Sequence, residues 1–287
     1  MAITTTTTGD STIPELWSAL TVDDREENLV IFNMYDRRFE EEAGAKAYDT
    51  IHIQGIGNYA SGATTLGVGG TLSYEAGVFN AQINLAIDTH AYHAFDLETE
   101  AEMLSNISHM EKLAHKSGYA LSLKMDDDAA GMIDDFGTNI VGSLVTGLEE
   151  ADVRTAMRML NDAIAPESGR YAVISPYQHE YFMGIEKFVN SLYKEAITGV
   201  STNGKYRGFI GTRYGADWYV SGNVEGTNAA GHDNGMFQKE AVAVAVFDQM
   251  RTKTFYNIDT DSTKFAVHAL YGLKEIRDNH GCFMRGL

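Results

Sequence analysis

Leu97–Met125 reads LETEAEMLSNISHMEKLAHKSGYALSLKM and contains no proline. Apolar or small residues recur at intervals of three and four, the spacing that places side chains on one stripe of an α-helix. That stripe comprises Met103, Ile107, Met110, Ala114, Gly118, Leu121 and Met125. Asp96 is suited to cap the first turn. At 1.5 Å per residue we expect one helix of roughly 43 Å, longer than a domain of ordinary size needs internally.

Two runs with a period of two precede this helix and predict a β-hairpin. In DTIHIQGI, Ile51 and Ile53 alternate with polar residues, and in AQINLAID the residues Ile83, Leu85 and Ile87 do the same. Each run has the pattern of a half-buried strand. We expect the two strands to pair with each other.

The segment between these strands, Gly55–Gly77, holds seven glycines and no lysine, arginine or proline. Such a tip is flexible when isolated. Its apolar side chains near the end are Tyr59, Leu66, Val68, Leu72 and Tyr74. Because a two-stranded hairpin is marginal on its own in water, we expect it to be covered by its own domain or by a neighbouring subunit. On the second reading these five residues are inter-subunit contacts.

The residues before the hairpin have the composition of an arm. Thr4–Thr8 is a low-complexity run with little to bury, and Ile13–Arg38 has apolar residues without a regular period, which predicts an extended segment with a short helix. The first residues, MAITTTTTGDSTIPELWSAL, lack the basic start and apolar core of a secretory signal. No run of about 18 apolar residues occurs, so we expect neither export by this route nor a membrane span.

The acidic run after the long helix, DDDAAGMIDDF at 126–136, carries five aspartates. It lacks the alternating ligands, the placed glycine and the terminal glutamate of a calcium-binding loop. We interpret it as a solvated helix end.

The region 146–232 predicts a mixed α/β sheet domain. Thr146-Gly-Leu-Glu149 has the spacing of a capping box, and an amphipathic helix follows until Pro166. The apolar residues of that helix are Val153, Ala156, Met157, Leu160 and Ile164.

A strand and a second helix follow in the same region. YAVIS, 171–175, predicts a short buried strand. Ser175 and Pro176, with Gln178 two residues on, restart a helix that Gly184 can close. GKYRGFIG and GADWYVSGNV add two β-rich runs.

Near the C-terminus, EAVAVAVFDQM and KTFYNI predict two buried strands and TKFAVHALYGLKEI predicts a third. The chain is therefore expected to close as sheet.

Charge and motif content disfavour several classes of function. The formal charge of −18, from 40 acidic and 22 basic residues, disfavours tight binding to a phosphate backbone. Cys282 is the single cysteine, which excludes an internal disulfide and a clustered-cysteine zinc site and fits a reducing place of synthesis. His90 and His93 point to opposite faces of a strand, so we expect structural histidines. The sequence contains no motif that recommends an enzyme, a cofactor or a metal site.

The order of the predicted elements along the chain is similar to that of a known protein family. A polar arm, a glycine-tipped hairpin, one long helix and an α/β domain that returns to a final sheet follow one another, and the local runs STIPELWS, GRYAVISPYQHEYF, GKYRGFIGTRYGADWYVSGNV and EAVAVAV lie within that order. The sequence resembles the major capsid protein of tailed double-stranded DNA bacteriophages, with the Hong Kong 97-type fold, over nearly its whole length.

The resemblance implies an α+β fold with a defined division of the chain. The expected parts are an amino-terminal arm at 1–47, an extended β-hairpin loop at 48–95, a peripheral domain with the spine helix at 96–145, an axial domain at 146–232, and closing strands at 233–287 that return to the peripheral and axial sheets. Within the spine helix we expect packing by Met103, Ile107, Met110, Ala114 and Leu121. Some members crosslink through a lysine on the extended loop, and the lysine-free tip here argues against that chemistry.

The function implied is that of a structural subunit, not an enzyme. Hexameric and pentameric rings of this chain would build an icosahedral shell around phage double-stranded DNA, without sequence-specific DNA binding and without a membrane. Scaffolding, portal and decoration proteins are the implied partners, the virion is the implied location, and the host bacterial cytoplasm is the place of synthesis. An acidic container also benefits from not gripping the DNA inside it.

Two alternatives remain open from the sequence. An encapsulin-like nanocompartment has the same fold but is loaded with protein cargo, so the nucleic acid content of purified particles separates it from a phage shell. A metal-dependent hydrolase using the aspartates at 126–135 is a more remote alternative, and metal analysis tests it.

Overall fold

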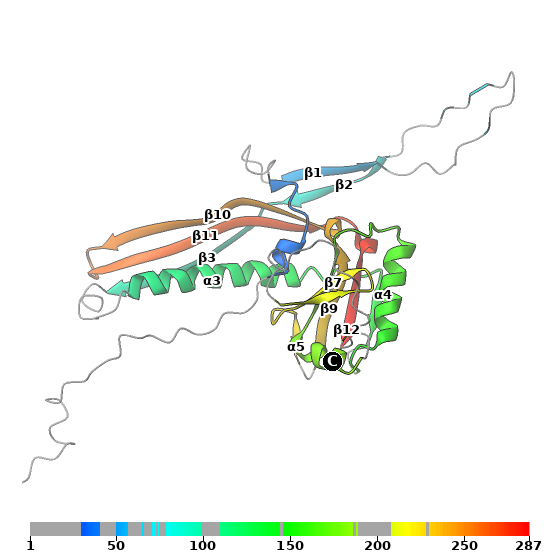
Figure 1. The fold of residues 1–287 in the computed structure, drawn as a ribbon. Helices are drawn as coiled ribbons and strands as arrows, with labels where there is room; N and C mark the ends of the chain where they lie inside the picture. The colour runs from blue at the N-terminus through cyan, green and yellow to red at the C-terminus, as the bar shows by residue number, and fades with distance from the viewer. Residues whose placement is uncertain are drawn as a thin grey trace, which may run out of the picture.

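The chain forms an α+β fold in which one long helix and a long sheet run side by side, with a second sheet at one end of them (Figure 1). The computed structural model describes residues 30–40, 50–56, 65, 71–72, 74, 79–98, 109–143, 146–185, 188, 208–227 and 230–286. The predicted α+β class is confirmed.

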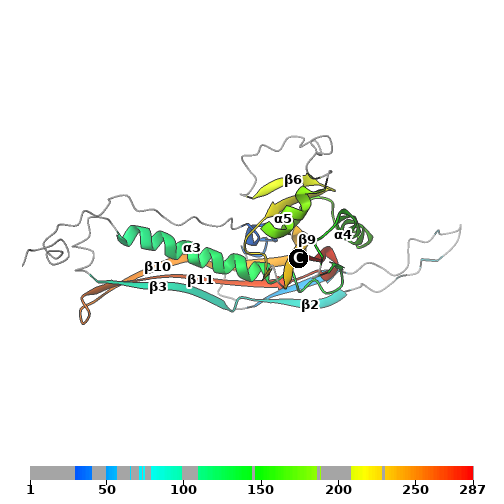
Figure 2. The same cartoon turned by 90° about the horizontal axis from the view of Figure 1, so that it is seen from below.

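The first sheet, here called the long sheet, has the strand order β10-β11-β3 and is antiparallel. Its strands are β3 (Thr89–Glu98), β10 (Val242–Asn257) and β11 (Ser262–Glu275). Helix α3 (His109–Ala130) packs against β3 and β11 on one face of this sheet (Figure 2). Leu121 and Ala129 of the helix share a core cluster with Val267 of the sheet.

The predicted start of the long helix is wrong. Leu97 and Glu98 are the last residues of β3, and Leu97 pairs with Thr263 of β11. Asp96, expected to cap the helix, lies in the same strand. Helix propensity is a weak prior, and here the ladder of backbone hydrogen bonds to β11 outweighs it.

At its other end α3 continues past Met125 to Ala130. Ala129 and Ala130 are buried, so the first part of the acidic run belongs to a packed helix. Of the residues predicted to pack on the spine helix, Met110, Ala114 and Leu121 lie in α3, whereas Met103 and Ile107 lie outside the described residues.

The second sheet, here called the mixed sheet, has the strand order β4-β12-β9-β5-β7-β6, with β8 paired to β9. Its strands are β4 (Ile140–Gly142), β5 (Arg170–Ile174), β6 (Phe209–Arg213), β7 (Ala216–Val220), β8 (Gly226–Thr227), β9 (Gly231–Gln238) and β12 (Gly281–Gly286). The β12–β4 and β5–β7 pairs are parallel, and the other described pairs are antiparallel. The C-terminal strand β12 therefore lies between β4 and β9, which are far from it in sequence.

Helix α4 (Glu150–Asp162) packs on the mixed sheet. Val153, Ala156 and Leu160 are fully buried and share a core cluster with Ile174 and Met284 of the sheet. These three helix residues lie at the spacing that predicted an amphipathic helix.

Both predicted ends of α4 are displaced in the structure. The N-cap is Glu149, whose backbone N–H donates to Asp152 Oδ2 at 2.9 Å, so the capping box lies three residues beyond the predicted one. The helix ends at Asp162, and Ile164 has a φ of 57° and is 85% exposed. Its predicted place on the buried stripe is wrong, because the chain reverses through a left-handed residue at this point.

The predicted strand and helix after α4 are confirmed. β5 is buried along most of its length, and α5 (Pro176–Met183) follows it directly. Ser175 is the N-cap, and its Oγ accepts a hydrogen bond from the backbone N–H of Gln178 at 3.0 Å. Proline at the first helical position and glycine at the end are the residues that predicted both ends of this helix from the sequence.

β10 is one strand where the sequence predicted two. Its register against β11 shifts on both sides of Asp248, and Met250 has a φ of 46°. Val242 to Val246 are buried, whereas Phe255 is 68% and Tyr256 is 50% exposed. The expectation that KTFYNI is a buried strand is therefore wrong.

The predicted hairpin is confirmed. β1 (Thr50–Ile56) pairs antiparallel with β2 (Phe79–Ala86), and Ile51 lies opposite Leu85. Its base packs on the face of the long sheet opposite α3 (Figure 2), where Ile51 and Leu85 share a cluster with Ala243 and Ala245. Gly272 permits this approach, because a Cβ there would lie 1.9 Å from the carbonyl oxygen of Ala86.

The N-terminal segment of the described chain, residues 30–38, lies where the two sheets meet and contains the short helix η2 (Phe32–Met34). All residues from 30 to 35 except the exposed Asn33 are buried, with Tyr35 against Phe237 of the mixed sheet and Phe32 against Tyr271 of the long sheet. Among the described residues, no helix is long and apolar enough to cross a membrane.

Candidate assembly surfaces and the joint between the sheets

The chain crosses between the two sheets at two adjacent points, which together we call the joint. η5 (Lys239–Ala241) connects β9 to β10, and η6 (Asp278–His280) connects β11 to β12. The carbonyl oxygen of Ala241 accepts hydrogen bonds from the backbone N–H groups of Ile276 and Arg277, at 2.8 and 3.1 Å. These bonds hold the two crossings together at the place where the chain passes between the sheets.

The N-terminal segment is hydrogen-bonded to helix α3 through Asp126. Phe32 N donates to Asp126 Oδ1 at 3.0 Å, and Asn223 Nδ2 donates to Oδ2 at 2.7 Å. Asp126 is 1% exposed, and burial raises its pKa while these donors oppose the rise. The prediction of a solvated helix end is therefore wrong for Asp126, which is a buried acceptor.

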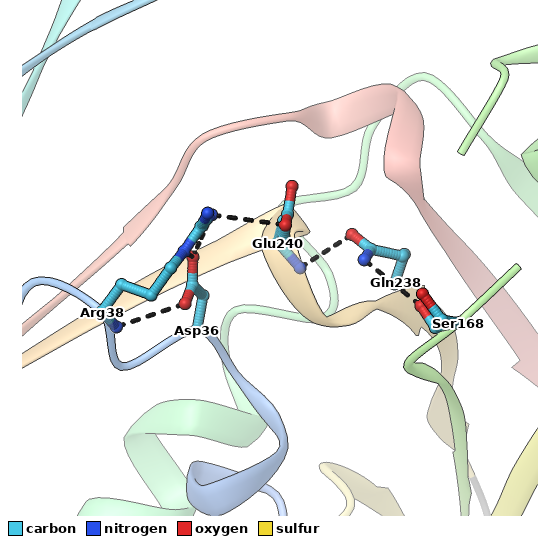
Figure 3. Close-up of polar contacts among 5 residues, drawn as sticks. All are labelled: Asp36, Arg38, Ser168, Gln238 and Glu240. Atoms are coloured by element: carbon cyan, nitrogen blue, oxygen red, sulfur yellow. Dashed lines mark hydrogen bonds and ion pairs between the residues drawn. The ribbon is translucent and has the colours of Figure 1, made fainter. Parts of the chain in front are cut away.

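A polar network links the same segment to η5 and to the mixed sheet (Figure 3). The Arg38 guanidinium contacts Asp36 Oδ2 at 2.6 Å and Glu240 Oε1 at 3.4 Å. The Glu240 backbone N–H donates to Gln238 Oε1 at 2.8 Å, and Gln238 Nε2 donates to the Ser168 carbonyl at 3.5 Å. The backbone of Asp36 also pairs with Val242 and Val244 at the start of β10. Residues 36–38 therefore act as a strap across the joint.

The hairpin residues predicted as contacts are partly described. Leu72 is 60% and Tyr74 is 88% exposed. Tyr59, Leu66 and Val68 lie outside the described residues. Both described residues are therefore large apolar side chains at the surface of the subunit.

A second exposed apolar group lies at the distal end of the β10–β11 hairpin, far from the joint (Figure 1). Phe255 is 68%, Tyr256 is 50% and Ile258 is 83% exposed. Sequence reasoning missed this group because the run KTFYNI looked like a core strand. The polar turn that follows, Asp259–Asp261, was the available signal, since it marks the run as the end of a hairpin.

The histidines and the cysteine have structural surroundings. His93 Nδ1 lies 3.1 Å from Ser117 Oγ of α3, whereas His90 stacks on His268 with ring centroids 5.3 Å apart. The two therefore have different neighbours, His93 the helix and His90 the histidine on β11. Cys282 is buried, and burial raises the pKa of its thiol to about 12, which disfavours a thiolate. Within the described residues, no group of three or more metal-binding side chains gathers.

Comparison with solved structures reveals whole-length similarity. A structure of Mycobacterium phage Che8 has a TM-score of 0.75 at 22% identity and covers 95% of this chain and 96% of its own. The capsid structure of cyanophage P-SCSP1u has a TM-score of 0.74 at 13% identity, covering 98% and 94%. The capsid of Ralstonia phage GP4 has a TM-score of 0.70 at 14% identity, covering 99% and 98%.

Sequence comparison adds no closer relative. No protein-family model matches the chain, and no curated protein matches it. The similarity is therefore one of fold, and it extends over almost the entire length of both partners in each comparison. The chain has the fold of phage capsid subunits.

Proposed function

We propose that this protein is the major capsid protein of a tailed phage, a structural subunit that assembles into the shell around the phage DNA. The observation that carries the proposal is the whole-length similarity to capsid structures, since 98% of this chain is covered by the cyanophage capsid subunit. A fold alone does not assign a function. Two further features of this chain support the proposal.

The first feature is the position of the exposed apolar groups. Leu72 and Tyr74 belong to one hairpin, and Phe255 and Ile258 belong to the end of another. Two different apolar patches on one subunit suit heterologous contacts, in which one surface of a copy meets a different surface of the next. Contacts of this kind close into rings, which for this chain we propose to be hexamers and pentamers.

The second feature is the charge. With a formal charge of −18, the inner surface of a shell would not bind packaged DNA tightly. Each subunit would make several contacts at once, so individually weak contacts are sufficient for a stable shell. Scaffolding, portal and decoration proteins are the proposed partners, and synthesis in the host bacterial cytoplasm precedes assembly into the virion.

Electron microscopy of the purified protein, with size-exclusion chromatography, tests the proposal. We expect rings or closed shells, formed by the protein alone or after co-expression with the scaffolding protein of the same phage. A stable monomer that forms no large assembly under either condition would contradict it.

A further inference from the structure

Two carboxyl groups face each other at the joint with no donor between them. Glu275 is the last residue of β11, and Asp278 opens η6, so the two lie on either side of the crossing from the long sheet to the mixed sheet. The two carboxyl groups lie close enough to act on each other, and, besides burial, Asp278 raises the pKa of Glu275. Glu275 Oε1 is enclosed and has no hydrogen-bond partner among the described groups. Two ionised carboxylates cannot satisfy each other, because both are only acceptors.

The second carboxyl group is already committed as an acceptor. Asp278 Oδ1 accepts from the backbone N–H of Thr138 at 3.2 Å, and Oδ2 accepts from the Thr138 hydroxyl. Thr138 lies between α3 and β4, so Asp278 ties that connection to η6. A proton between the two carboxyl groups is therefore carried by Glu275, which then donates a hydrogen bond to Asp278. Protonation also removes the negative charge from the enclosed Glu275 carboxyl group.

We propose that Glu275 and Asp278 share one proton across the joint, and that uptake of this proton locks the crossing from the long sheet to the mixed sheet. Without the proton, two negative charges repel each other at the point where the backbone passes between the sheets. With it, the pair is one hydrogen bond that joins the end of β11 to the start of η6.

The surrounding charges favour this protonation at near-neutral pH. Burial, Asp278 and Asp135 raise the pKa of Glu275 to about 7, and Lys274 on its own strand opposes the rise. On η5, Glu240 is paired with Arg38 of the strap. Asp135 comes from the turn after α3, and burial raises its pKa as well. Burial is thus the first cause of the raised Glu275 pKa, and Asp278 and Asp135 add to it against the opposing charge of Lys274.

His280 on η6 responds to pH in the opposite direction. Burial and Arg277 lower its pKa below the usual 6.5, so protonation of His280 opposes folding as the pH falls below that value. For Glu275 the folded pKa is higher than the unfolded one. Its contribution to stability is present below about 4.5 and is lost as the pH rises from there to about 7. A test therefore has to separate the effect of Glu275 on stability from the effect of His280.

The variant Glu275→Gln isolates it, because glutamine keeps the size of the side chain and a donor toward Asp278 but cannot ionise. We expect the difference in Tm between wild type and E275Q to be smallest at pH 4.5, where the contribution of protonated Glu275 is largely present. At pH 8 we expect the variant to melt roughly 2–8 °C higher. Glu167→Gln, at an exposed position before β5, is the matched control and should keep the wild-type dependence on pH. The proposal is overturned if E275Q and wild type show the same change of Tm between the two pH values.

Infrared spectroscopy gives a second and more direct measurement. We expect a carboxylic acid C=O band in the wild-type spectrum at pH 6 that disappears on titration through neutral pH and is absent from E275Q. Absence of that band in wild type would overturn the proposal even if E275Q did not fold.

The consequence for a shell rests on the proposed function. If the joint sets the angle between the sheets, shells of wild-type protein should change shape or stability across neutral pH, and shells of E275Q should not. The Tm and infrared measurements concern the subunit alone. A protein that shares the proton but never assembles would therefore support this inference and contradict the proposed function.

Discussion

The two halves of strand β10 differ in burial although both contain several apolar residues. Val242 to Val246 are at most 6% exposed, whereas Phe255 and Tyr256 are half exposed or more. In the first half the valines face the cluster that contains α3 and the N-terminal segment, and Ala243 and Ala245 face the base of the β1–β2 hairpin. In the second half β10 is the edge strand of the sheet, and α3 packs on β3 and β11 instead. Burial is therefore decided by what covers a strand and not by the strand's own composition.

The largest expected effect is at the centre of the covered half. Val244 is fully buried, and Val244→Asp would place a charge there without a partner. We expect a loss of more than about 4 kcal/mol in the free energy of unfolding, enough to prevent folding. Circular dichroism and denaturant unfolding measure it. Thr254→Asp, in the exposed half, is the control and should change stability by less than about 0.5 kcal/mol. Equal losses in the free energy of unfolding of V244D and T254D would show that the two halves of β10 do not differ in burial.

Removal of the Asp126 carboxylate should loosen the segment that covers the start of β10. Asp126→Ala leaves the buried Phe32 N–H and the Asn223 side chain without their acceptor. We expect a loss of about 2–4 kcal/mol, measured by denaturant unfolding. Asp127→Ala, the exposed neighbour, is the control. If hydrogen exchange at residues 30–36 were as slow in D126A as in wild type, Asp126 would not hold this segment.

A smaller effect is expected where the hairpin covers the other face. Gly272→Ala would force a Cβ to within 1.9 Å of the Ala86 carbonyl oxygen, so the end of β2 must move away from the long sheet. We expect a loss of about 1–3 kcal/mol, measured by thermal unfolding. Ala269→Gly on the same strand removes a methyl group without a clash and serves as the comparison. An unchanged Tm in G272A would mean that the hairpin base tolerates displacement.

The smallest effect on stability, and the most specific effect on assembly, is expected in the exposed half. Phe255→Asp should change the free energy of unfolding by less than about 0.5 kcal/mol while it reduces the formation of rings or shells. Phe255→Leu keeps an apolar surface and should still assemble. Thermal unfolding with analytical ultracentrifugation separates the two properties. If F255D unfolded like V244D, Phe255 would belong to the subunit's own core.

Local patterns predicted those elements whose ends and faces are marked by neighbouring residues. The alternation of Ile51 and Ile53 predicted β1 and its pairing with β2, and Ser175 with Pro176 predicted the start of α5. In these cases the signal and the structure lie within a few residues of each other. The order of the elements also supported the resemblance that led to the fold.

The candidate surfaces were predicted only in part. The hairpin tip was selected by its glycines and its unpartnered apolar residues, and Leu72 and Tyr74 are exposed. Phe255, Tyr256 and Ile258 were assigned to a core because an apolar run has the same composition whether or not another element covers it. The joint was not predicted, since it is formed by chain segments that are distant in sequence.

The sequence by itself determined the β1–β2 hairpin, the strand and helix at 170–183 and the existence of one long helix, because periodicity and capping are local properties. The α+β class was implied by the resemblance in the order of these elements. Only the tertiary structure decided that Leu97 and Glu98 belong to a strand and not to that helix, which half of β10 is buried and why Asp126 is not in solvent. The reason is distance along the chain. Phe32 and Asp126 are 94 residues apart, and Tyr271 and Asp128 are 143 apart. Pairing and burial of this kind depend on which segments meet, and no local pattern specifies that.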